Sequence, residues 1–156
     1  MKTKKYFPLF MDLNSKKVMV VGGGTIAERR IRTLLDFVEE IWVIAPEISD
    51  GIRELKEQGR IFWKKKRYER EDIYDADLVL AATDDRKVNE DIYSACKCLG
   101  ILVNTASDRR KCDFYFPGIL LEEDVVMGFN SGGDPVKSRE MRRKVERLLH
   151  QPGGKE

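Results

Sequence analysis

The sequence is poor in the residues that build metal centres and hydrolytic sites. Its single histidine, His150, lies in the expected C-terminal tail, so we predict neither a histidine-rich zinc site nor a Ser-His-Asp triad. The cysteines Cys96, Cys98 and Cys112 are odd in number, and we expect no secretory signal. This argues against a disulfide framework and favours a reducing, cytoplasmic setting. Cys96 and Cys98 lie two positions apart in an expected helix, where they point to different faces and chelate poorly, so we predict no metal site. No apolar run approaches the about 18 residues that a membrane span needs, so no membrane contact is expected.

Charges of the two signs nearly cancel. The chain has 29 Lys and Arg against 27 Asp and Glu, a net charge of +2, and this balance gives no indication of a nucleic-acid partner. Hydrophobic residues make up 42% of the 156 residues, which is typical of a folded domain and excludes wholesale disorder. The length allows one domain with a substantial core and a short appendage.

The most informative segment is VMVVGGGTIA at residues 18–27. It reads as a buried strand that enters a glycine-rich turn and then a helix. In the Gly-x-Gly-x-x-Ala spacing, Gly22 permits a tight turn, Gly24 lets the backbone approach a pyrophosphate, and Ala27 allows close packing of helix on strand. A helix beginning near Thr25 points free N–H groups and its positive dipole end at the phosphates. The segment therefore predicts a dinucleotide site.

Strands and helices alternate through the first two thirds of the chain. We expect strands at 17–21, 41–45, 60–63, 77–83 and 101–104, and helices at 25–37, 49–58 and 86–98. Gly59 and Gly100 follow two of these helices, as left-handed caps do. The β-α-β-α-β order predicts an α/β fold, a Rossmann-like doubly wound parallel sheet.

The pattern changes beyond residue 112. Residues 114–121 and 124–130 are expected to form two strands, and 136–149 a basic helix whose apolar stripe is thin. Such a stripe usually needs a partner surface, and a second subunit is a reasonable candidate. We therefore predict an NAD-binding Rossmann domain at 1–112, a small strand-helix extension for dimerisation and the substrate side at 113–149, and a disordered tail at 150–156.

The motifs, taken in order, resemble the precorrin-2 dehydrogenase family of sirohaem biosynthesis, some members of which are also sirohydrochlorin ferrochelatases. Ala-Ala-Thr-Asp-Asp at 81–85, followed by Val88-Asn89, is the most specific of them. The others are 8–13, 20–29, 43–47, 100–104, 112–117 and 131–135. Together they span nearly the whole chain.

This resemblance implies an NAD-dependent oxidoreductase that converts precorrin-2 to sirohydrochlorin as a cytoplasmic homodimer. It assigns the cofactor to three loops. The pyrophosphate contacts are Gly22, Gly24, Thr25 and Ile26; the ribose contacts are Pro46 and Glu47; the nicotinamide side is lined by Ala82, Thr83 and Asp84. A carboxylate at Glu47 favours a free ribose hydroxyl, and hence NAD over NADP.

One departure concerns catalysis. The family typically has Asn-Val-Val-Asp-Asp after the fifth strand, and its first aspartate is the proposed catalytic group. Here that position holds Ser107, which is not an acid or base near neutral pH without activation. Asp108 is adjacent and is our candidate catalytic residue. Two alternatives stay open: Asp108 only orders a loop, or the reaction needs only cofactor positioning.

Substrate contacts are expected from polar and basic residues, because precorrin-2 carries many carboxylates. The candidates are Asn104, Arg109, Arg110 and Ser131. Two functional alternatives remain beside dehydrogenation. In the first alternative, the chain is a bifunctional enzyme that also inserts iron into sirohydrochlorin. In the second alternative, it is a non-catalytic module that binds NAD or a tetrapyrrole. The family has a longer helical C-terminal region, so part of the tetrapyrrole pocket or of the dimer is expected to be missing here.

Overall fold

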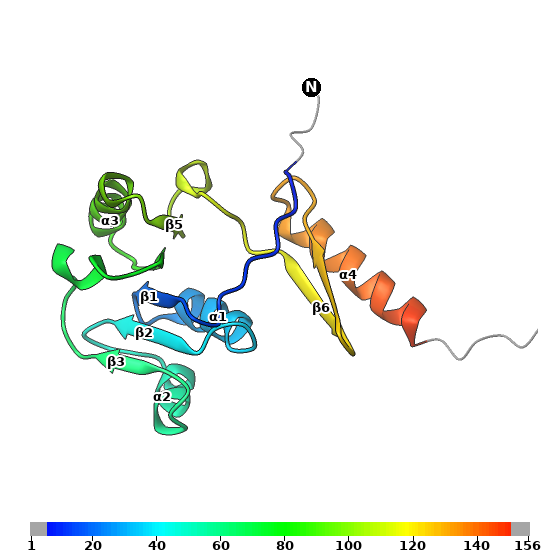
Figure 1. Ribbon diagram of the computed structural model, residues 1–156, viewed down its shortest axis with the longest axis horizontal. Helices are drawn as coiled ribbons and strands as arrows, with labels where there is room; N and C mark the ends of the chain where they lie inside the picture. Colours follow the sequence, from blue (N-terminus) through cyan, green and yellow to red (C-terminus); the bar gives the residue numbers. More distant parts are fainter. Residues whose placement is uncertain (1–5, 151–156) are drawn as a thin grey trace, which may run out of the picture. The chain divides into compact units, whose positions relative to one another are not determined.

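The computed structural model describes residues 6–150, and the predicted tail residues 151–156 lie outside this range. The described chain forms two compact units, one of residues 11–114 and one of residues 6–10 with 115–150 (Figure 1). The division falls after Phe114, whereas we had predicted a boundary at 112 with the N-terminal segment in the Rossmann domain. Residues 6–10 belong to the second unit, where the Tyr6 and Tyr115 rings pack with centroids 4.7 Å apart.

The first unit is built on a five-stranded parallel sheet. Its strands lie in the order β3-β2-β1-β4-β5. Their bounds are β1 Lys17–Val21, β2 Glu40–Ile44, β3 Phe62–Lys64, β4 Leu78–Ala81 and β5 Leu102–Thr105. The chain winds outward from β1 to one side and then returns to build the other side. This confirms the predicted doubly wound Rossmann-like sheet.

Both faces of this sheet are covered, because alternate residues of each strand point to opposite sides. Met19, Val21 and Ile44 form a buried cluster with Ile92 and Cys96 of helix α3 (Arg86–Leu99). Residues of the opposite parity, such as Val18 and Val20, are fully buried on the other face. That face is covered by α1 (Thr25–Leu34) and α2 (Asp50–Glu57). The buried helix residues there are Ala27, Ile31, Leu34, Ile52 and Leu55.

The helix ends follow local hydrogen bonding. Ser49 and Asp85 cap α2 and α3 through their side chains, and Gly59 and Gly100 have left-handed φ angles of 71° just beyond these helices, as predicted. The first helix is shorter than the predicted 25–37. The N–H groups of Phe37 and Val38 both donate to the carbonyl of Leu34, so the chain tightens into turns there.

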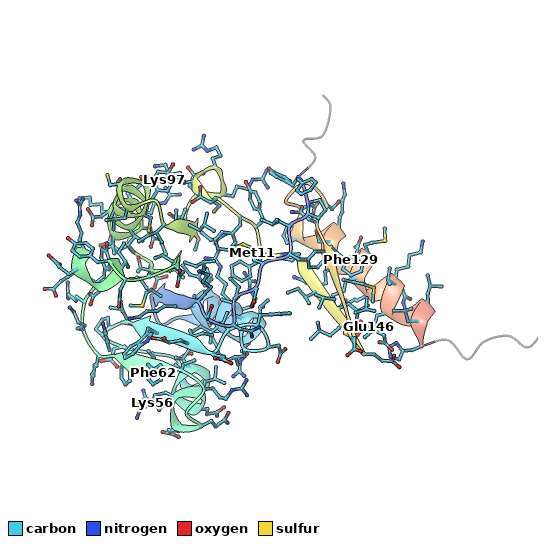
Figure 2. All side chains as sticks on the ribbon, viewed as in Figure 1. Met11, Lys56, Phe62, Lys97, Phe129 and Glu146 are labelled. Carbon is cyan, nitrogen blue, oxygen red and sulfur yellow. The ribbon has the colours of Figure 1, made fainter. Side chains whose placement is uncertain are left out.

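The edge strand β3 lies further along the chain than the predicted 60–63. Its register pairs Phe62, labelled in Figure 2, with Trp42 and pairs Lys64 with Ile44. The Phe62 ring stacks on Trp42 with centroids 4.6 Å apart. A lysine is acceptable at this position because an edge strand is partly solvated. The short 3-10 helix η1 (Arg70–Ile73) follows and leads to β4, which is shorter than the predicted 77–83.

The second unit is a hairpin with one helix. Strands β6 (Gly118–Glu122) and β7 (Val125–Phe129) pair antiparallel, and α4 (Pro135–Leu149) runs along them (Figure 1). Gly118 and the buried Leu120 lie on the strand face toward α4, where the Gly118 backbone approaches Ser138 and Arg142. The predicted strand-helix extension is thus present, with β6 beginning later than residue 114 because Tyr115–Pro117 lead into it.

Packing on the sheet, rather than helix propensity, is expected to hold α1 in place. Ile31 is fully buried and Ile26, on the same helix, is 42% exposed. Ile31→Ala is expected to lower the free energy of unfolding by about 2–5 kcal/mol, because it leaves a cavity in the core. The matched change Ile26→Ala is expected to cost about 0.5 kcal/mol or less. Urea denaturation followed by circular dichroism measures both, and equal losses would contradict this packing role.

Candidate cofactor and substrate site

The candidate site lies at the carboxyl ends of β1 and β4, the two neighbouring strands from which the chain turns to opposite sides of the sheet. Open parallel sheets place their ligands at such a switch point. Gly22 follows β1 and Ala82 follows β4, so the glycine-rich loop and the motif at 81–85 meet here. The N–H of Ala82 donates to the carbonyl of Val21 at 2.8 Å.

In the glycine-rich loop, Gly22 and Gly23 each lie too close to another backbone segment to carry a side chain. Gly22 has a φ of 119°, and a Cβ atom there lies only 2.3 Å from the carbonyl oxygen of Ala82. At Gly23 a Cβ atom lies 2.1 Å from the carbonyl oxygen of Glu47, so this position also needs glycine. The fingerprint spacing predicts no role for Gly23, because it allows any residue at that position. The constraint comes from the loop after β2, whose Ser49 N–H donates to the Gly23 carbonyl at 2.8 Å.

Gly24 and the start of α1 offer room for a ligand. A Cβ atom at Gly24 meets no described atom within 4 Å, so the open space beside this backbone is available to a phosphate group. Gly24 is the N-cap residue, and no side chain of the described residues caps the helix. The first N–H groups and the dipole of α1 are therefore directed at that space. Thr25 and Ile26 are exposed beside it, so these residues fit a dinucleotide pyrophosphate.

Carboxylates border the loop that follows β2. Pro46 and Glu47 are exposed there. Glu28 of α1 accepts a hydrogen bond from Ser49 Oγ at 2.6 Å and pairs with Arg32 at 2.9 Å. These contacts, the bond from Ser49 first, lower the pKa of Glu28, so its carboxylate is ionised. The N-terminus of α2 allows this close approach because residue 51 is glycine, where a Cβ atom lies 2.0 Å from Glu28 Oε1.

Asn89 fixes the loop after β4. Its Oδ1 accepts from the N–H of Thr83 at 3.2 Å and lies 2.8 Å from Thr83 Oγ1, and its Nδ2 donates to the Thr83 carbonyl at 2.9 Å. Asn89 is only 1% exposed. In the sequence, Asn89 stands out only as part of the motif Val88-Asn89, which predicts no role for its side chain. The available signal was an amide at a core-facing position of a helix, since buried amides need hydrogen-bond partners. Asp84 is exposed beside this loop.

The chain after β5 carries the other predicted residues. Asn104 Nδ2 donates to the carbonyl of Phe114 at 2.7 Å, and Asn104 Oδ1 is buried without a hydrogen-bond partner among residues 6–150. Ser107 Oγ lies 3.0 Å from Thr105 Oγ1. The Cys112 thiol accepts from the Thr105 N–H at 3.3 Å and ties the two ends of this loop together. Lys97 of α3, labelled in Figure 2, pairs with Asp113 just beyond it.

Asp108 has a defined structural task in this loop. It is the N-cap of the 3-10 helix η2 (Arg109–Lys111) and accepts from the Arg110 N–H at 2.9 Å. Its carboxylate oxygens also accept hydrogen bonds from Arg110 Nε at 3.1 Å and from Arg110 Nη2 at 2.9 Å. These hydrogen bonds, those from the Arg110 side chain first, lower the pKa of Asp108 to about 2. Asp108 is therefore a carboxylate at neutral pH and a weak base.

The remaining candidates belong to different units. Arg109 and Arg110 are exposed on η2 in the first unit. Ser131 belongs to the second unit, between β7 and α4, where its N–H donates to Ser138 Oγ at 2.9 Å. Within residues 6–150, no group of three or more His, Cys, Asp and Glu side chains is placed to hold a metal ion. None of the helices in that range is long and apolar enough to cross a membrane.

A family model described as "Putative NAD(P)-binding" matches residues 9–118. The chain belongs to this NAD(P)-binding family. Curated relatives include a sirohaem synthase of Mannheimia succiniciproducens, 41% identical over 147 residues, which cover 94% of this chain and 31% of the relative. Another is a probable multifunctional sirohaem biosynthesis protein of Ruminiclostridium josui, 43% identical over 125 residues, 80% of this chain and 24% of the relative. The chain therefore spans about a third or less of these relatives.

Among solved structures, SirC, a precorrin-2 dehydrogenase, superposes with a TM-score of 0.72 at 27% identity, covering 92% of this chain and 71% of SirC. The family resemblance inferred from the motifs is thereby confirmed. So is a nicotinamide cofactor as the ligand class. The open space beside Gly24 fits the expected contact with its pyrophosphate.

Gly22 and Gly24 are expected to respond differently to substitution. Gly22→Ala forces a left-handed φ and a clash with the Ala82 carbonyl, so it is expected to lower the free energy of unfolding by roughly 1–3 kcal/mol. Gly24→Ala has room in the free protein and is expected to cost less than about 1 kcal/mol. Its added methyl group occupies the phosphate space, so the Kd for NAD is expected to rise at least about tenfold.

Thermal unfolding and isothermal titration with NAD separate these effects. A Gly24→Ala protein that binds NAD as tightly as the parent chain would show that the pyrophosphate does not lie against this backbone.

Proposed function

We propose that this chain is an NAD-dependent dehydrogenase that oxidises precorrin-2 to sirohydrochlorin in sirohaem biosynthesis. The observation that carries the proposal is the glycine cradle at the switch point, with the loops after β4 and β5 beside it. Two kinds of relatives support it: sirohaem synthases by sequence and SirC by structure. SirC, a precorrin-2 dehydrogenase, supports the proposed substrate and reaction, and the sirohaem synthases support the proposed pathway.

The residues have separable tasks in this reaction. Bound NAD supplies the chemistry by accepting a hydride. Gly22, Gly24, Thr25 and Ile26 hold its pyrophosphate. Asn89 fixes the backbone of Thr83, so that the loop Ala82–Asp84 forms a rigid wall on the nicotinamide side. Such positioning is the main contribution that a protein makes to hydride transfer.

Proton removal does not need a strong protein base in our proposal. Ser107 occupies the position of the family's catalytic aspartate, and its neighbour Asp108 has a pKa lowered to about 2. A carboxylate of such low basicity abstracts protons poorly. Of the alternatives left open by the sequence, we favour cofactor positioning, with the proton passing to solvent. Asp108 then acts as a positioning residue that orients Arg110.

NAD, rather than NADP, is the proposed cofactor. Glu47 is exposed in the loop that follows β2. The ionised Glu28 of α1 contacts Ser49, the N-cap residue of α2. A carboxylate at this place accepts hydrogen bonds from a free ribose 2′-hydroxyl and repels a 2′-phosphate. NADP is therefore expected to support a much lower rate than NAD in the assay below.

A homodimer is proposed from the exposed face of the hairpin. Ile119, Leu121 and Val126 point away from α4, according to the register of β6 and β7. Leu121 is 45% and Val126 37% exposed. A two-stranded sheet with one covered face leaves this apolar surface to a partner.

We also propose a cytoplasmic location, because Cys96, Cys98 and Cys112 are all free thiols.

Dehydrogenase activity is tested by NADH formation at 340 nm with enzymatically generated precorrin-2. The parent chain is expected to form NADH. Asp108→Ala is expected to raise KM, because Arg110 loses its fixed orientation. It is expected to keep kcat within about tenfold, because Asp108 is not the general base in this proposal. Loss of a general base would typically lower kcat by about 10²–10⁴-fold.

The pH profile gives a second readout for Asp108. Since its pKa is about 2, Asp108 stays ionised across pH 5–9, and its removal is expected to shift no inflection of kcat in that range. A kcat reduced more than a hundredfold, or an inflection lost in Asp108→Ala, would make Asp108 the catalytic base after all. No NADH from any protein would reject the proposed reaction.

Sedimentation velocity tests the dimer. The parent chain is expected to sediment as a dimer and Leu121→Asp as a monomer, because the carboxylate is not tolerated in an apolar interface. Leu99→Asp is the matched control, since Leu99 is an equally exposed leucine, 46%, at the end of α3. A dimeric Leu121→Asp protein would place the interface elsewhere.

A further inference from the structure

A small cavity lies beside the loop that carries Ser107 and Asp108. Its volume is about 170 Å³, and it is lined by Arg86, Glu90, Ser107, Asp108 and Arg110. All five residues belong to the first unit. Arg86 begins α3 just after the loop that contains Thr83, while Ser107 and Asp108 follow β5. The cavity is therefore on the same edge of the sheet as the cofactor cradle.

The cavity wall carries two arginines and two carboxylates, and Lys111, which pairs with Glu90, adds a third cation. Asp108 is paired with Arg110 through two side-chain hydrogen bonds, which fix the guanidinium plane. Glu90 is paired with Lys111. Each carboxylate on the wall thus has its own cation. Arg86 has no ion-pair partner among the described residues and contributes the excess positive charge.

Arg86 is also an unfavourable choice for its place in the helix. It is the first residue of α3, and the first turn of α3 contains no acidic residue. A cation near a helix N-terminus opposes the helix dipole, and here only the N-cap carboxylate of Asp85 offsets it. Residues that break a local rule are often kept for a function.

We propose that Arg86, together with Arg110 and the Ser107 hydroxyl, binds a carboxylate group of the tetrapyrrole substrate. Guanidinium groups and a hydroxyl are donors suited to a carboxylate, and the cavity accommodates one acidic side arm rather than a ring. Holding one arm here places the edge of the substrate next to the nicotinamide wall. The identity of the ligand rests on the proposed dehydrogenase function, whereas the anion site itself rests on the cavity and its charges.

The test compares Arg86→Gln with Lys87→Gln. Both changes remove one positive charge from the first turn of α3, but Lys87 is exposed and does not line the cavity. Arg86→Gln is expected to raise the KM for precorrin-2 and the Kd for its product sirohydrochlorin about tenfold, which corresponds to about 1.4 kcal/mol. The Kd for NAD is expected to be unchanged. Lys87→Gln is expected to resemble the parent chain, and Arg86→Lys to recover part of the affinity.

Binding of sirohydrochlorin, followed by its absorbance, separates this proposal from the proposed function. If the parent chain forms no NADH but Arg86→Gln alone weakens sirohydrochlorin binding, the carboxylate site stands and the dehydrogenase assignment fails. If NADH forms and Arg86→Gln behaves like Lys87→Gln, the carboxylate site is wrong and the dehydrogenase stands. A parent chain that does not bind sirohydrochlorin would overturn the carboxylate site.

Discussion

The close approach of two backbones at the switch point is the constraint on which the rest of the site depends. Gly22 lies against the carbonyl of Ala82, at a distance where no Cβ atom fits. Because β1 and β4 are neighbours, this contact brings the glycine loop and the loop after β4 to one edge of the sheet. The proposed cofactor cradle, the proposed nicotinamide wall and the cavity at Arg86 all lie along that edge. A bulkier residue at position 22 would separate the two loops that must act on one ligand.

Single buried or half-buried side chains then fix the loops around this contact. Asn89 holds the backbone of Thr83 from the helix side. Ser49 links the loop after β2 to Gly23 through its backbone and to Glu28 through its hydroxyl. The Cys112 thiol ties together the loop after β5. The site is thus preorganised by hydrogen bonds that originate in the helices and loops around it, which is how loops become rigid enough to position a cofactor.

The loop after β5 shows how neighbouring charges decide what a residue does. Asp108 and Arg110 are two residues apart, and η2 folds them into a closed pair. The pair weakens Asp108 as a base and gives Arg110 a fixed orientation. Ser107 is left as a neutral hydroxyl on the cavity wall, which Arg86 and Arg110 also line. Such an arrangement favours binding an anion over removing a proton.

The sequence by itself determined the fold class, the order of the strands and helices, and the position of the glycine-rich loop. These depend on local patterns: apolar runs for buried parallel strands, caps such as Asp85 and Gly100, and glycine spacing after β1. Only the tertiary structure decided the need for glycine at position 23, the role of Asn89, and the placement of Arg86 and Arg110 on one cavity wall. Each of these depends on a contact between segments distant in the chain. A pattern read along one segment carries no information about which atoms of another segment come to lie beside it.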